Sequence, residues 1–380
     1  MAEFQCRVCD ADGLETLDAF AQIARVTSDC KPWPAGGKMA VCHRCGAIQK
    51  LPDAAWFADI ESIYKGYQIY ELSGGAEQVI FSGDGQGAPR SHRLVDFIKQ
   101  TAALPPRGKL IDIGCGNGGA LRTFSGALPD WKLFGSELTD AAAPSLRMLP
   151  NFVDLFTVEP ADIKDRFDLV SMIHSLEHMP EPSKTLRDAA GLMTASGVLF
   201  VEVPDAETSP FDLIVADHLV HFSPATLRLL AERNGLSVQV LRNDFLPKEN
   251  TMLARRGATT VAKPDPAAGV ALARRNIAWL GAVMDKAAAA AAGGKPFGLF
   301  GTSISGTWLY GALRDKIKFF VDEDVTRVGQ SVEGRPIVAP SAIPKDGVVF
   351  VPLIPSVADK VIARLSVAGA QFVGPPPFGA

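Results

Sequence analysis

A glycine-rich stretch, "LIDIGCGNGG" at residues 110–119, carries the clearest chemical signal in the sequence. Gly114, Gly116 and Gly119 have the G-x-G-x-x-G spacing of loops that hold a dinucleotide. However, Asp112 stands two residues before the first glycine. A carboxylate about 4 Å from a phosphate would cost roughly 4 kcal/mol at an effective dielectric constant near 20. The loop therefore disfavours the pyrophosphate of a cofactor such as NAD.

S-adenosylmethionine fits these residues better, because it carries an ammonium and a sulfonium and no phosphate. Glu137 ends the next apolar run, "KLFGSE", 18 residues after Gly119, where a carboxylate can bind the two hydroxyls of a ribose. A purely structural turn is the alternative. We predict S-adenosylmethionine as the cofactor, and the predicted binding residues are Asp112, Gly114, Cys115, Gly116, Asn117, Gly118, Glu137 and Leu138, with Cys115 also expected to pack as a small side chain.

Two C-x-x-C pairs near the N-terminus indicate a metal site. Cys6, Cys9, Cys42 and Cys45 supply four thiolates, which suits a tetrahedral zinc ion with no position left for water. We therefore predict a structural zinc ion, with two unrelated pairs of thiols as the alternative. Neither pair lies in a βαβ pattern, which disfavours a redox role. Cys30 and His43 are spare candidate ligands.

The segment "SMIHSLEHMPEP" contains His174, Glu177 and His178, which literally match the zinc-protease pattern H-x-x-E-H. Pro180 and Pro182 follow at once, so the helix that such a site needs cannot continue. We reject that function. Glu177 and His178 could instead order the loop by hydrogen bonds.

A second histidine-rich segment, "VADHLVHFSPATLRLLAERNG", precedes a predicted helix. That helix should start after Ser223, with Pro224 at its first position, and end at Asn234-Gly235. His218 lies just before it and can accept a proton near neutral pH. We predict His218 as the general base; a histidine that caps or bridges the loop is the alternative.

The order of apolar runs predicts an α/β protein with three parts. Strands are expected at "KLIDIG", "WKLFGSE", "FDLVSMI" and "GVLFVEVP", alternating with helices, which predicts a Rossmann-like parallel sheet. A linker at 258–269 and an Ala-rich helix over about 267–292 precede a smaller α/β unit. The predicted domains are a zinc-binding module at 1–85, a cofactor-binding core at 86–257 and a substrate-binding α/β domain at 258–380.

The smaller unit has a second glycine loop, "GLFGTSISG". Hydroxyls and backbone N–H groups there would lie at a helix N-terminus, which suits a phosphate. Asp322 follows 21 residues after Gly301. We expect either a seat for a nucleotide diphosphate or a Rossmann-like unit used only for packing. The loop residues are Gly301, Thr302, Ser303, Ser305 and Gly306.

The composition of the 380 residues is that of an ordinary globular protein, with 47% hydrophobic and 21% charged residues. The net charge of −4 gives no sign of a nucleic-acid or membrane surface. The start, MAEFQCRVCD, lacks the features of a signal peptide, so we expect a cytoplasmic protein with reduced cysteines. The sequence leaves the oligomeric state open.

Taken together, these motifs resemble a known family. Residues from about 90 to 255 look like a class I methyltransferase, and the full chain resembles the three-domain, zinc-containing sugar C-methyltransferases. The resemblance rests on the order C-x-x-C, C-x-x-C, D-x-G-x-G-x-G, H-x-x-E-H and D-H-x-x-H-F-S. It implies that the first module binds zinc, the middle binds S-adenosylmethionine and the last helps to hold the substrate.

The resemblance also implies roles for individual residues. It puts His174 beside the cofactor or the acceptor. In that family a Tyr-x-Glu-His group serves deprotonation; Asp217 and His218 match its last two members, but Val215 stands in place of the tyrosine. A tyrosine-rich segment folds over the site, which here is "YKGYQIYELSGGAEQ" with Tyr67 and Tyr70. Packing between domains is the alternative for that segment.

The sequence thus predicts a methyltransferase that acts on a sugar, specifically by C-methylation of a nucleotide-linked keto-deoxysugar. The acceptor would attack the sulfonium methyl group in line, without a catalytic metal. O- or N-methylation of another small molecule or glycan is the first alternative. Alternatives from other classes are an NAD-dependent oxidoreductase, which Asp112 disfavours, and a non-catalytic zinc- and nucleotide-binding module.

Overall fold

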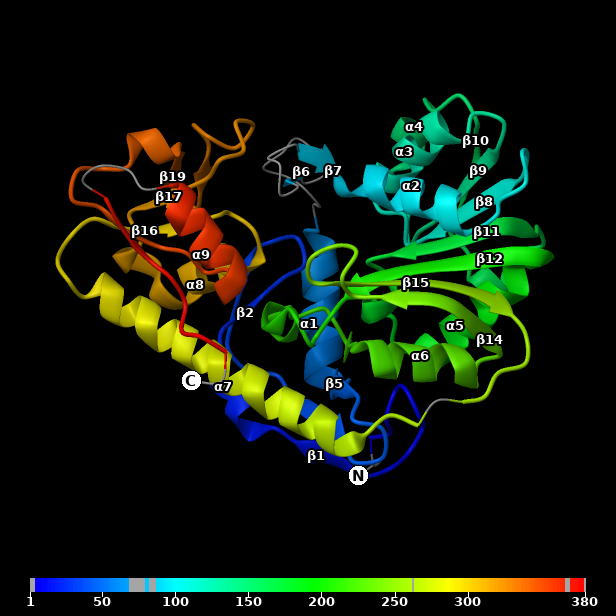
Figure 1. Ribbon diagram of the computed structural model, residues 1–380, viewed down its shortest axis with the longest axis horizontal. Helices are drawn as coiled ribbons and strands as arrows, with labels where there is room; N and C mark the ends of the chain where they lie inside the picture. Colours follow the sequence, from blue (N-terminus) through cyan, green and yellow to red (C-terminus); the bar gives the residue numbers. More distant parts are fainter. Residues whose placement is uncertain (1–3, 68–78, 82–86, 262, 366–369, 379–380) are drawn as a thin grey trace.

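Three units built around separate sheets make up the chain (Figure 1). The computed structural model describes residues 4–67, 79–81, 87–261, 263–365 and 370–378. A seven-stranded sheet lies on the right in Figure 1 and a six-stranded sheet on the left, with the N-terminal strands between and below them. Tyr70, a predicted site residue, lies outside the described residues.

The seven-stranded sheet has the order β10-β9-β8-β11-β12-β15-β14. The four predicted strands are confirmed as β8, β9, β11 and β12, which run parallel. The prediction of a parallel sheet is wrong at β15, which is antiparallel to both of its neighbours, β12 and β14. The reason is local, because β14 and β15 follow each other through a short connection, which favours antiparallel pairing. The strand bounds are β8 Lys109–Ile113, β9 Lys132–Ser136, β10 Phe152–Phe156, β11 Phe167–Ile173, β12 Met193–Pro204, β14 Leu236–Arg242 and β15 Glu249–Arg256.

Helices cover both faces of this sheet, as β–α alternation predicts. Successive residues of β8 divide between the two faces: Leu110 packs in one apolar core and Ile111 in the other. Helix α6 begins as predicted, because Ser223 and Thr226 form a capping box and Pro224 is the first helical residue. The helices are α2 Arg90–Thr101, α3 Gly119–Ala127, α4 Ala143–Leu146, α5 Pro182–Leu192 and α6 Pro224–Arg233.

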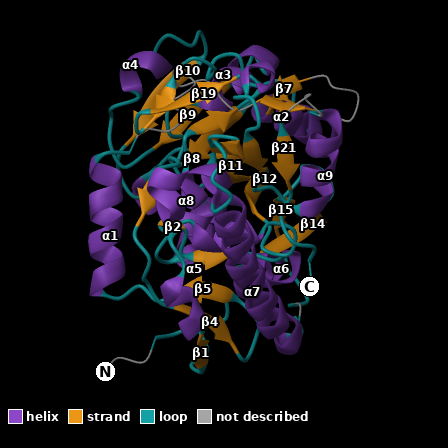
Figure 2. Cartoon of the chain, turned by 90° about the vertical axis from the view of Figure 1, so that its left-hand side faces the viewer, coloured by secondary structure: helices purple, strands orange, loops and turns teal. Residues whose placement is uncertain are grey.

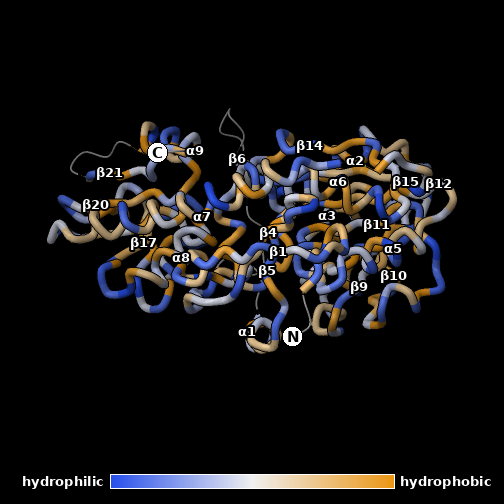
Figure 3. The backbone as a smooth tube through the Cα atoms, turned by 90° about the horizontal axis from the view of Figure 1, so that it is seen from below, coloured by the Kyte–Doolittle hydropathy of each residue, from blue (hydrophilic) through white to orange (hydrophobic). Residues whose placement is uncertain are grey.

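The N-terminal unit is joined to the core by a shared sheet. Its strands β1, β4 and β5 are extended by β13, which comes from the histidine-rich segment, with His221 opposite Ile48. Figure 3 has β1, β4 and β5 between the other two units. The elements are β1 Leu14–Thr16, β2 Arg25–Val26, β3 Pro32–Trp33, β4 Met39–Cys42, β5 Ile48–Lys50, α1 Ala54–Lys65, β6 Val79–Phe81, β7 Gly87–Pro89 and β13 Val220–His221.

The C-terminal unit begins with the long helix α7, which packs against β4 of the N-terminal unit (Figure 2). Asp265 caps α7 and Pro266 is its first residue, so the predicted linker ends earlier than expected. The six-stranded sheet has the order β18-β19-β17-β16-β20-β21. The elements are α7 Pro266–Ala291, β16 Phe297–Phe300, α8 Ile304–Leu313, β17 Phe319–Val321, β18 Ser331–Val332, β19 Arg335–Val338, β20 Val348–Phe350, α9 Pro355–Arg364 and β21 Gln371–Val373.

None of the helices in the described part of the chain combines the length and the apolar character that crossing a membrane requires.

Candidate active site

The predicted glycine loop connects β8 to α3 at the carboxyl ends of the parallel strands, where ligands bind in open α/β sheets. Gly114 has a φ of +73° and Gly116 a φ of +55°, which favour glycine. A Cβ at Gly114 would lie 2.5 Å from the Cβ of Ser175, so only glycine fits there. A Cβ at Gly116 would meet nothing within 4 Å, so this part of the backbone is open to a ligand.

Two carboxylates flank the loop. Asp112 is buried at the end of β8 and accepts a hydrogen bond from Oγ of Ser171 at 2.7 Å. Burial raises the pKa of Asp112 to about 7, despite that hydrogen bond. Glu137 follows β9, accepts hydrogen bonds from the backbone N–H groups of Gly116 at 2.7 Å and Leu138 at 2.9 Å, and so lies beside the open loop. A cationic ligand near Asp112 would lower the pKa of this carboxyl and so favour its charged form.

The other predicted cofactor residues differ in exposure. Asn117 contacts Arg122 through its side-chain and main-chain oxygens. Leu138 is exposed, which leaves an apolar side chain at the edge of the loop. Cys115 is buried and packs under Gly135, where an added Cβ would come within 2.7 Å of its sulfur. Cys115 is thus a packing residue, as the sequence also indicated.

The first histidine segment lies directly against the glycine loop. Ser175 donates a hydrogen bond to the carbonyl of Ile113 at 2.8 Å. His174 has a φ of +50°, an unusual value for a residue other than glycine. A short 3-10 helix, Leu176–His178, follows, and α5 starts only at Pro182. The long helix of a zinc protease is therefore absent from this described segment, as the prolines predicted.

Behind His174 lies a group of buried carboxylates with an arginine. Nδ1 of His174 is 3.3 Å from Oε1 of Glu177, and Nε2 is 3.5 Å from Oε2 of Glu249. Arg90 contacts His174 and lies 3.7 Å from Glu249. Burial and the charge of Arg90 hold the pKa of His174 well below its usual value. Burial raises the pKa of Glu177 to about 8, and that of Glu202 well above its usual value. Burial thus favours the neutral form of both carboxyl groups.

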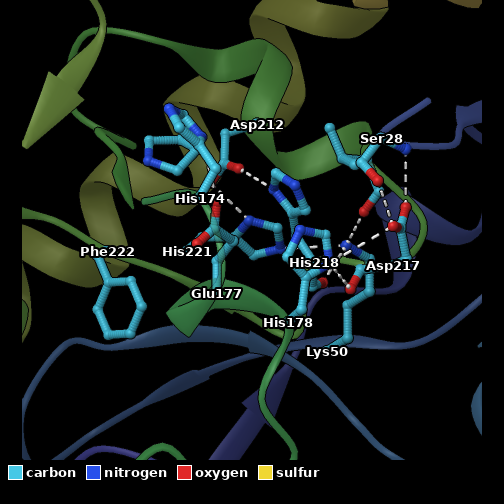
Figure 4. Close-up of polar contacts among 12 residues, drawn as sticks. Ser28, Lys50, His174, Glu177, His178, Asp212, Asp217, His218, His221 and Phe222 are labelled. Atoms are coloured by element: carbon cyan, nitrogen blue, oxygen red, sulfur yellow. Dashed lines mark hydrogen bonds and ion pairs between the residues drawn. The ribbon is translucent and has the colours of Figure 1, made fainter. Parts of the chain in front are cut away.

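A buried aspartate that sequence reasoning missed organises the second histidine segment (Figure 4). Asp212, in the 3-10 helix Pro210–Ile214, accepts hydrogen bonds from Nδ1 of His218 at 2.6 Å and Nδ1 of His221 at 2.7 Å. Burial alone lowers the pKa of His218, but the hydrogen bond and charge of Asp212 outweigh it and raise the pKa. His218 is thus a stronger base than an ordinary histidine.

Asp217, which the family pattern pairs with His218, hydrogen-bonds a residue of the N-terminal unit. It accepts hydrogen bonds from the backbone N–H of Ser28 at 2.9 Å and from Oγ of Ser28 at 2.5 Å. Its Oδ2 lies 3.4 Å from Nδ1 of His178. Tyr67 shares this contact through its hydroxyl, 3.1 Å from Oγ of Ser28. Asp217 therefore ties the N-terminal unit to the histidine cluster.

His178 and His218 face each other across the cluster, with ring centroids 4.6 Å apart and nearly perpendicular planes. Nδ1 of His178 is 3.1 Å from the carbonyl of Asp217 and 3.2 Å from the hydroxyl of Tyr64. Burial and the charge of His218 lower the pKa of His178 to about 4, so the ring is neutral.

Lys50 brings a fully buried amine under the same segment. Its Nζ donates hydrogen bonds to the carbonyls of Val215 at 2.5 Å and His218 at 2.8 Å, and lies 3.2 Å from Nε2 of His221. Burial lowers the pKa of Lys50 to about 7, against the charge of Asp212. Strand β5, which ends at Lys50, therefore supports the backbone that carries His218.

The four cysteines come together as predicted. Sγ of Cys6 and Cys45 are 3.6 Å apart, as are those of Cys9 and Cys42, and all four lie within 4.8 Å of one another. Sulfurs about 2.3 Å from a tetrahedral zinc ion would be about 3.8 Å apart, so the donor set fits zinc. Backbone N–H groups of Val8 and Arg44 point at two of the sulfurs. The spare candidates, Cys30 and His43, lie outside this group.

In the C-terminal unit, the predicted phosphate loop is closed by side chains. Oγ1 of Thr302 donates a hydrogen bond to Asp322 at 2.9 Å and accepts one from Arg327 at 3.1 Å. Ser303 is the N-cap of α8, but its side chain makes no capping hydrogen bond. A surface hollow of about 320 Å³ borders Asp322. Arg327 supplies the positive charge that the sequence pattern did not reveal.

Several residues of the site were missed by sequence reasoning: Ser28, Lys50, Arg90, Glu202, Asp212 and Glu249. Asp212 could have been found, because it is a carboxylate six residues before His218, just ahead of the segment that begins at Val215. Ser28 and Lys50 meet this segment across 165 or more residues of sequence, so no local pattern reveals them.

Comparisons with known proteins agree with this geometry. Residues 88–240 match the protein family described as a methyltransferase domain. The ribosomal RNA small subunit methyltransferase C of Serratia proteamaculans is 28% identical over 138 residues, which cover 35% of this chain and 38% of that protein. The ubiquinone biosynthesis O-methyltransferase of Stutzerimonas stutzeri is 26% identical over 140 residues, which cover 34% of this chain and 59% of that protein.

The chain thus spans less than two thirds of the length of either relative. Among solved structures, an S-adenosylmethionine-dependent methyltransferase from Clostridium acetobutylicum is similar over 53% of this chain and 98% of its own, with 11% identity and a TM-score of 0.38. Residues 88–240 hold the glycine loop and both histidine segments. The part of the chain that is similar to known methyltransferases is therefore the part that carries the candidate site.

Proposed function

We propose that the chain transfers a methyl group from S-adenosylmethionine to a small molecule bound beside the histidine cluster. One contact carries this proposal: Ser175, next to His174, packs on Gly114 of the glycine loop. A cofactor on that loop would therefore lie next to the first histidine segment, whose His178 faces His218. We retain the division into units at 1–85, 86–257 and 258–380 as part of the proposal, together with a compartment that keeps thiols reduced, such as the cytoplasm.

The cofactor supplies an electrophilic methyl group on its sulfonium. Asp112 would favour the ammonium of its amino-acid part, and Glu137 would exchange its hydrogen bond with Gly116 for the hydroxyls of the ribose. The four cysteines Cys6, Cys9, Cys42 and Cys45 would hold a structural zinc ion that stabilises the N-terminal unit. NAD remains disfavoured, because the buried carboxylate of Asp112 would meet its phosphates.

On the acceptor side, His218 would accept the proton that the attacking group loses. Asp212 holds Nδ1, so Nε2 is the nitrogen left for this task. The acceptor and the methyl group would be held in line, which converts binding energy into rate. His174 and the tyrosine-rich segment with Tyr67 would border the acceptor.

For the acceptor we propose a sugar, and C-methylation of a nucleotide-linked keto-deoxysugar as the specific reaction. The order of motifs along the whole chain supports it. The net charge of −4 is unlike that of a nucleic-acid-binding domain, which argues against an RNA substrate.

O-methylation of another small molecule is the second candidate, and Val215 favours it. Val215 is buried where the sugar C-methyltransferases have a tyrosine, so no hydroxyl can act from that position. One relative is also named as an O-methyltransferase.

The two candidates can be separated by following a methyl-labelled cofactor. The protein is incubated with 13C-methyl S-adenosylmethionine and either nucleotide-linked keto-deoxysugars or hydroxylated aromatic acceptors. The 13C shift distinguishes methyl on carbon from methyl on oxygen. We expect C-methyl product from the sugars, and none from an Asp112→Ala variant. Product from the second panel alone would favour O-methylation, and product from neither would contradict both acceptor classes.

A further inference from the structure

Glu177 is a buried carboxylate without a hydrogen-bond partner. Its exposed fraction is 0%, and within the described structure neither of its oxygens accepts a hydrogen bond. Nδ1 of His174 lies 3.3 Å from Oε1 but makes no hydrogen bond to it. A buried carboxyl group that makes no hydrogen bond is unfavourable unless it is paired or bound to a metal.

Two imidazole rings lie beside this carboxylate. One ligand atom each from Glu177, His178 and His218 lie within 4.8 Å of one another. Ligands about 2.1 Å from one ion are at most about 4 Å apart, so small side-chain shifts would bring the three onto a common centre. Figure 4 draws Glu177, His178 and His218 in one cluster.

Both rings are already oriented through Nδ1. The carboxylate of Asp212 holds Nδ1 of His218 at 2.6 Å, and the carbonyl of Asp217 lies 3.1 Å from Nδ1 of His178. Nε2 of each ring is not used by these contacts. A histidine that binds a metal through one ring nitrogen almost always donates the N–H of the other nitrogen to a carboxylate or a carbonyl.

The charge around the three groups is also suited to a cation. The carboxylates of Asp212, Asp217 and Glu249 lie close enough to act electrostatically on the cluster, and all are buried or half-buried. Arg90 and Lys50 are the positive groups, and both are engaged elsewhere, Arg90 beside Glu249 and Lys50 on backbone carbonyls.

We propose that Glu177, His178 and His218 form a second metal site, which binds a first-row divalent ion such as Zn²⁺. Two histidines and one carboxylate are a ligand set that leaves open positions on zinc and on Fe²⁺. A neighbouring set, His174 with Glu202 and Glu249, has one histidine and two carboxylates, and Arg90 already contacts His174 and lies 3.7 Å from Glu249. We therefore assign the ion to the first set.

The catalytic consequence rests on the proposed methyltransferase function. An ion with an open position would bind the keto oxygen of the acceptor and lower the pKa of the neighbouring C–H group. The proton would leave to water, the carbon would attack the methyl carbon, and the bond between that methyl carbon and sulfur would break to release S-adenosylhomocysteine. His218 would then be a metal ligand instead of the base.

Metal analysis of the purified full chain tests the site without any acceptor. We expect two ions per chain, one on the four cysteines and one on the new site. Glu177→Gln and His178→Gln should each retain one ion, whereas the matched surface variants Glu159→Gln and His92→Gln should retain two. Unchanged binding of S-adenosylhomocysteine in these variants would show that they are folded.

Cobalt identifies the ligands. After the second ion is removed, added Co²⁺ should give a weak visible spectrum without thiolate charge-transfer bands, and Glu177→Gln should weaken Co²⁺ binding at least tenfold. The proposal would be overturned if the parent protein held only the cysteine-bound ion and took up no further Co²⁺. This would be so even if the protein methylated an acceptor. Co²⁺ binding at this site without any methyl transfer would leave the site standing and contradict the proposed function.

Discussion

Nδ1 of His218 and Oδ1 of Asp212 are 2.6 Å apart, and the other oxygen of Asp212 holds His221 at 2.7 Å. One buried carboxylate therefore fixes the orientation of two histidines on a segment that also joins the N-terminal sheet. The consequence is that the same nitrogen of His218 always faces the cluster, whether it serves as a base or as a metal ligand.

Replacing Asp212 should damage catalysis more than cofactor binding. In Asp212→Asn the charge that orients His218 is lost, and we expect kcat to fall about 10–100-fold. The KM for S-adenosylmethionine should stay within about twofold, because the hydrogen bonds of Asp212 are to His218 and His221 and not to the glycine loop. Steady-state kinetics test this, with the exposed Asp244→Asn as control. An unchanged kcat would contradict the role of Asp212.

Lys50 should position the active segment from the N-terminal unit. In Lys50→Met the hydrogen bonds to the carbonyls of Val215 and His218 are lost, and methionine fills much of the same buried space. We expect kcat to fall about tenfold or more, with S-adenosylhomocysteine binding retained. Lys38→Met, at an exposed lysine, is the matched control. Equal kinetics in the two variants would mean that Lys50 has only a structural role.

The affinity for the cofactor should depend on pH through Asp112. Its pKa is raised by burial to about 7 in the free protein, and an ammonium beside it would lower that pKa. Binding of S-adenosylhomocysteine should then release a proton below pH 7 and weaken as the pH falls from 8 to 6. Calorimetry in buffers of different ionisation enthalpy measures this. The dependence should disappear in Asp112→Asn.

The same carboxyl should also affect stability. Because the pKa of Asp112 is higher in the folded protein than the model-peptide value of 3.8, its contribution is present at low pH and is lost as the pH rises towards and beyond 7. Asp112→Asn removes the buried charge, so its free energy of unfolding at pH 8 should exceed that of the parent by on the order of 2–4 kcal/mol. Denaturant unfolding of the parent and the variant at pH 5 and pH 8 measures this difference. A variant that is no more stable than the parent at pH 8 would refute the prediction.

Loss of the cysteine-bound ion should disturb the active site as well as the N-terminal unit. Cys42→Ser removes one of four sulfurs, and we expect a lower melting temperature and loss of methyl transfer, because β4 and β5 carry the sheet that β13 joins. Cys30→Ser should keep its zinc, since Cys30 lies outside the cluster. Zinc analysis with thermal unfolding decides; full zinc content in Cys42→Ser would argue against the four-sulfur site.

The fold of the core could be predicted from local pattern. The runs around β8, β9, β11 and β12 are apolar and lie between helical periods, and Ser223 with Pro224 marked the start of α6. The pattern could not reveal that β15 inserts antiparallel beside β12, because an apolar run does not encode its direction. It also could not reveal β13, a two-residue strand whose partner, β5, is some 170 residues away.

The site was predictable where chemistry and spacing coincide in one segment. Asp112 with its glycines and the paired cysteines are of this kind. The partner of His218 was not, because an aspartate next to it, Asp217, matched the family pattern while Asp212 makes the hydrogen bond. Which of two nearby carboxylates reaches a ring depends on how the loop turns, and here Ser28 draws Asp217 towards the N-terminal unit.

The most direct test of the account is calorimetric titration of the purified protein with S-adenosylhomocysteine and, separately, with NADH. We predict binding of one S-adenosylhomocysteine per chain, lost in Glu137→Ala and retained in Glu159→Gln, and no binding of NADH. Binding of NADH without binding of S-adenosylhomocysteine would contradict the assignment of the glycine loop, and with it the methyltransferase activity.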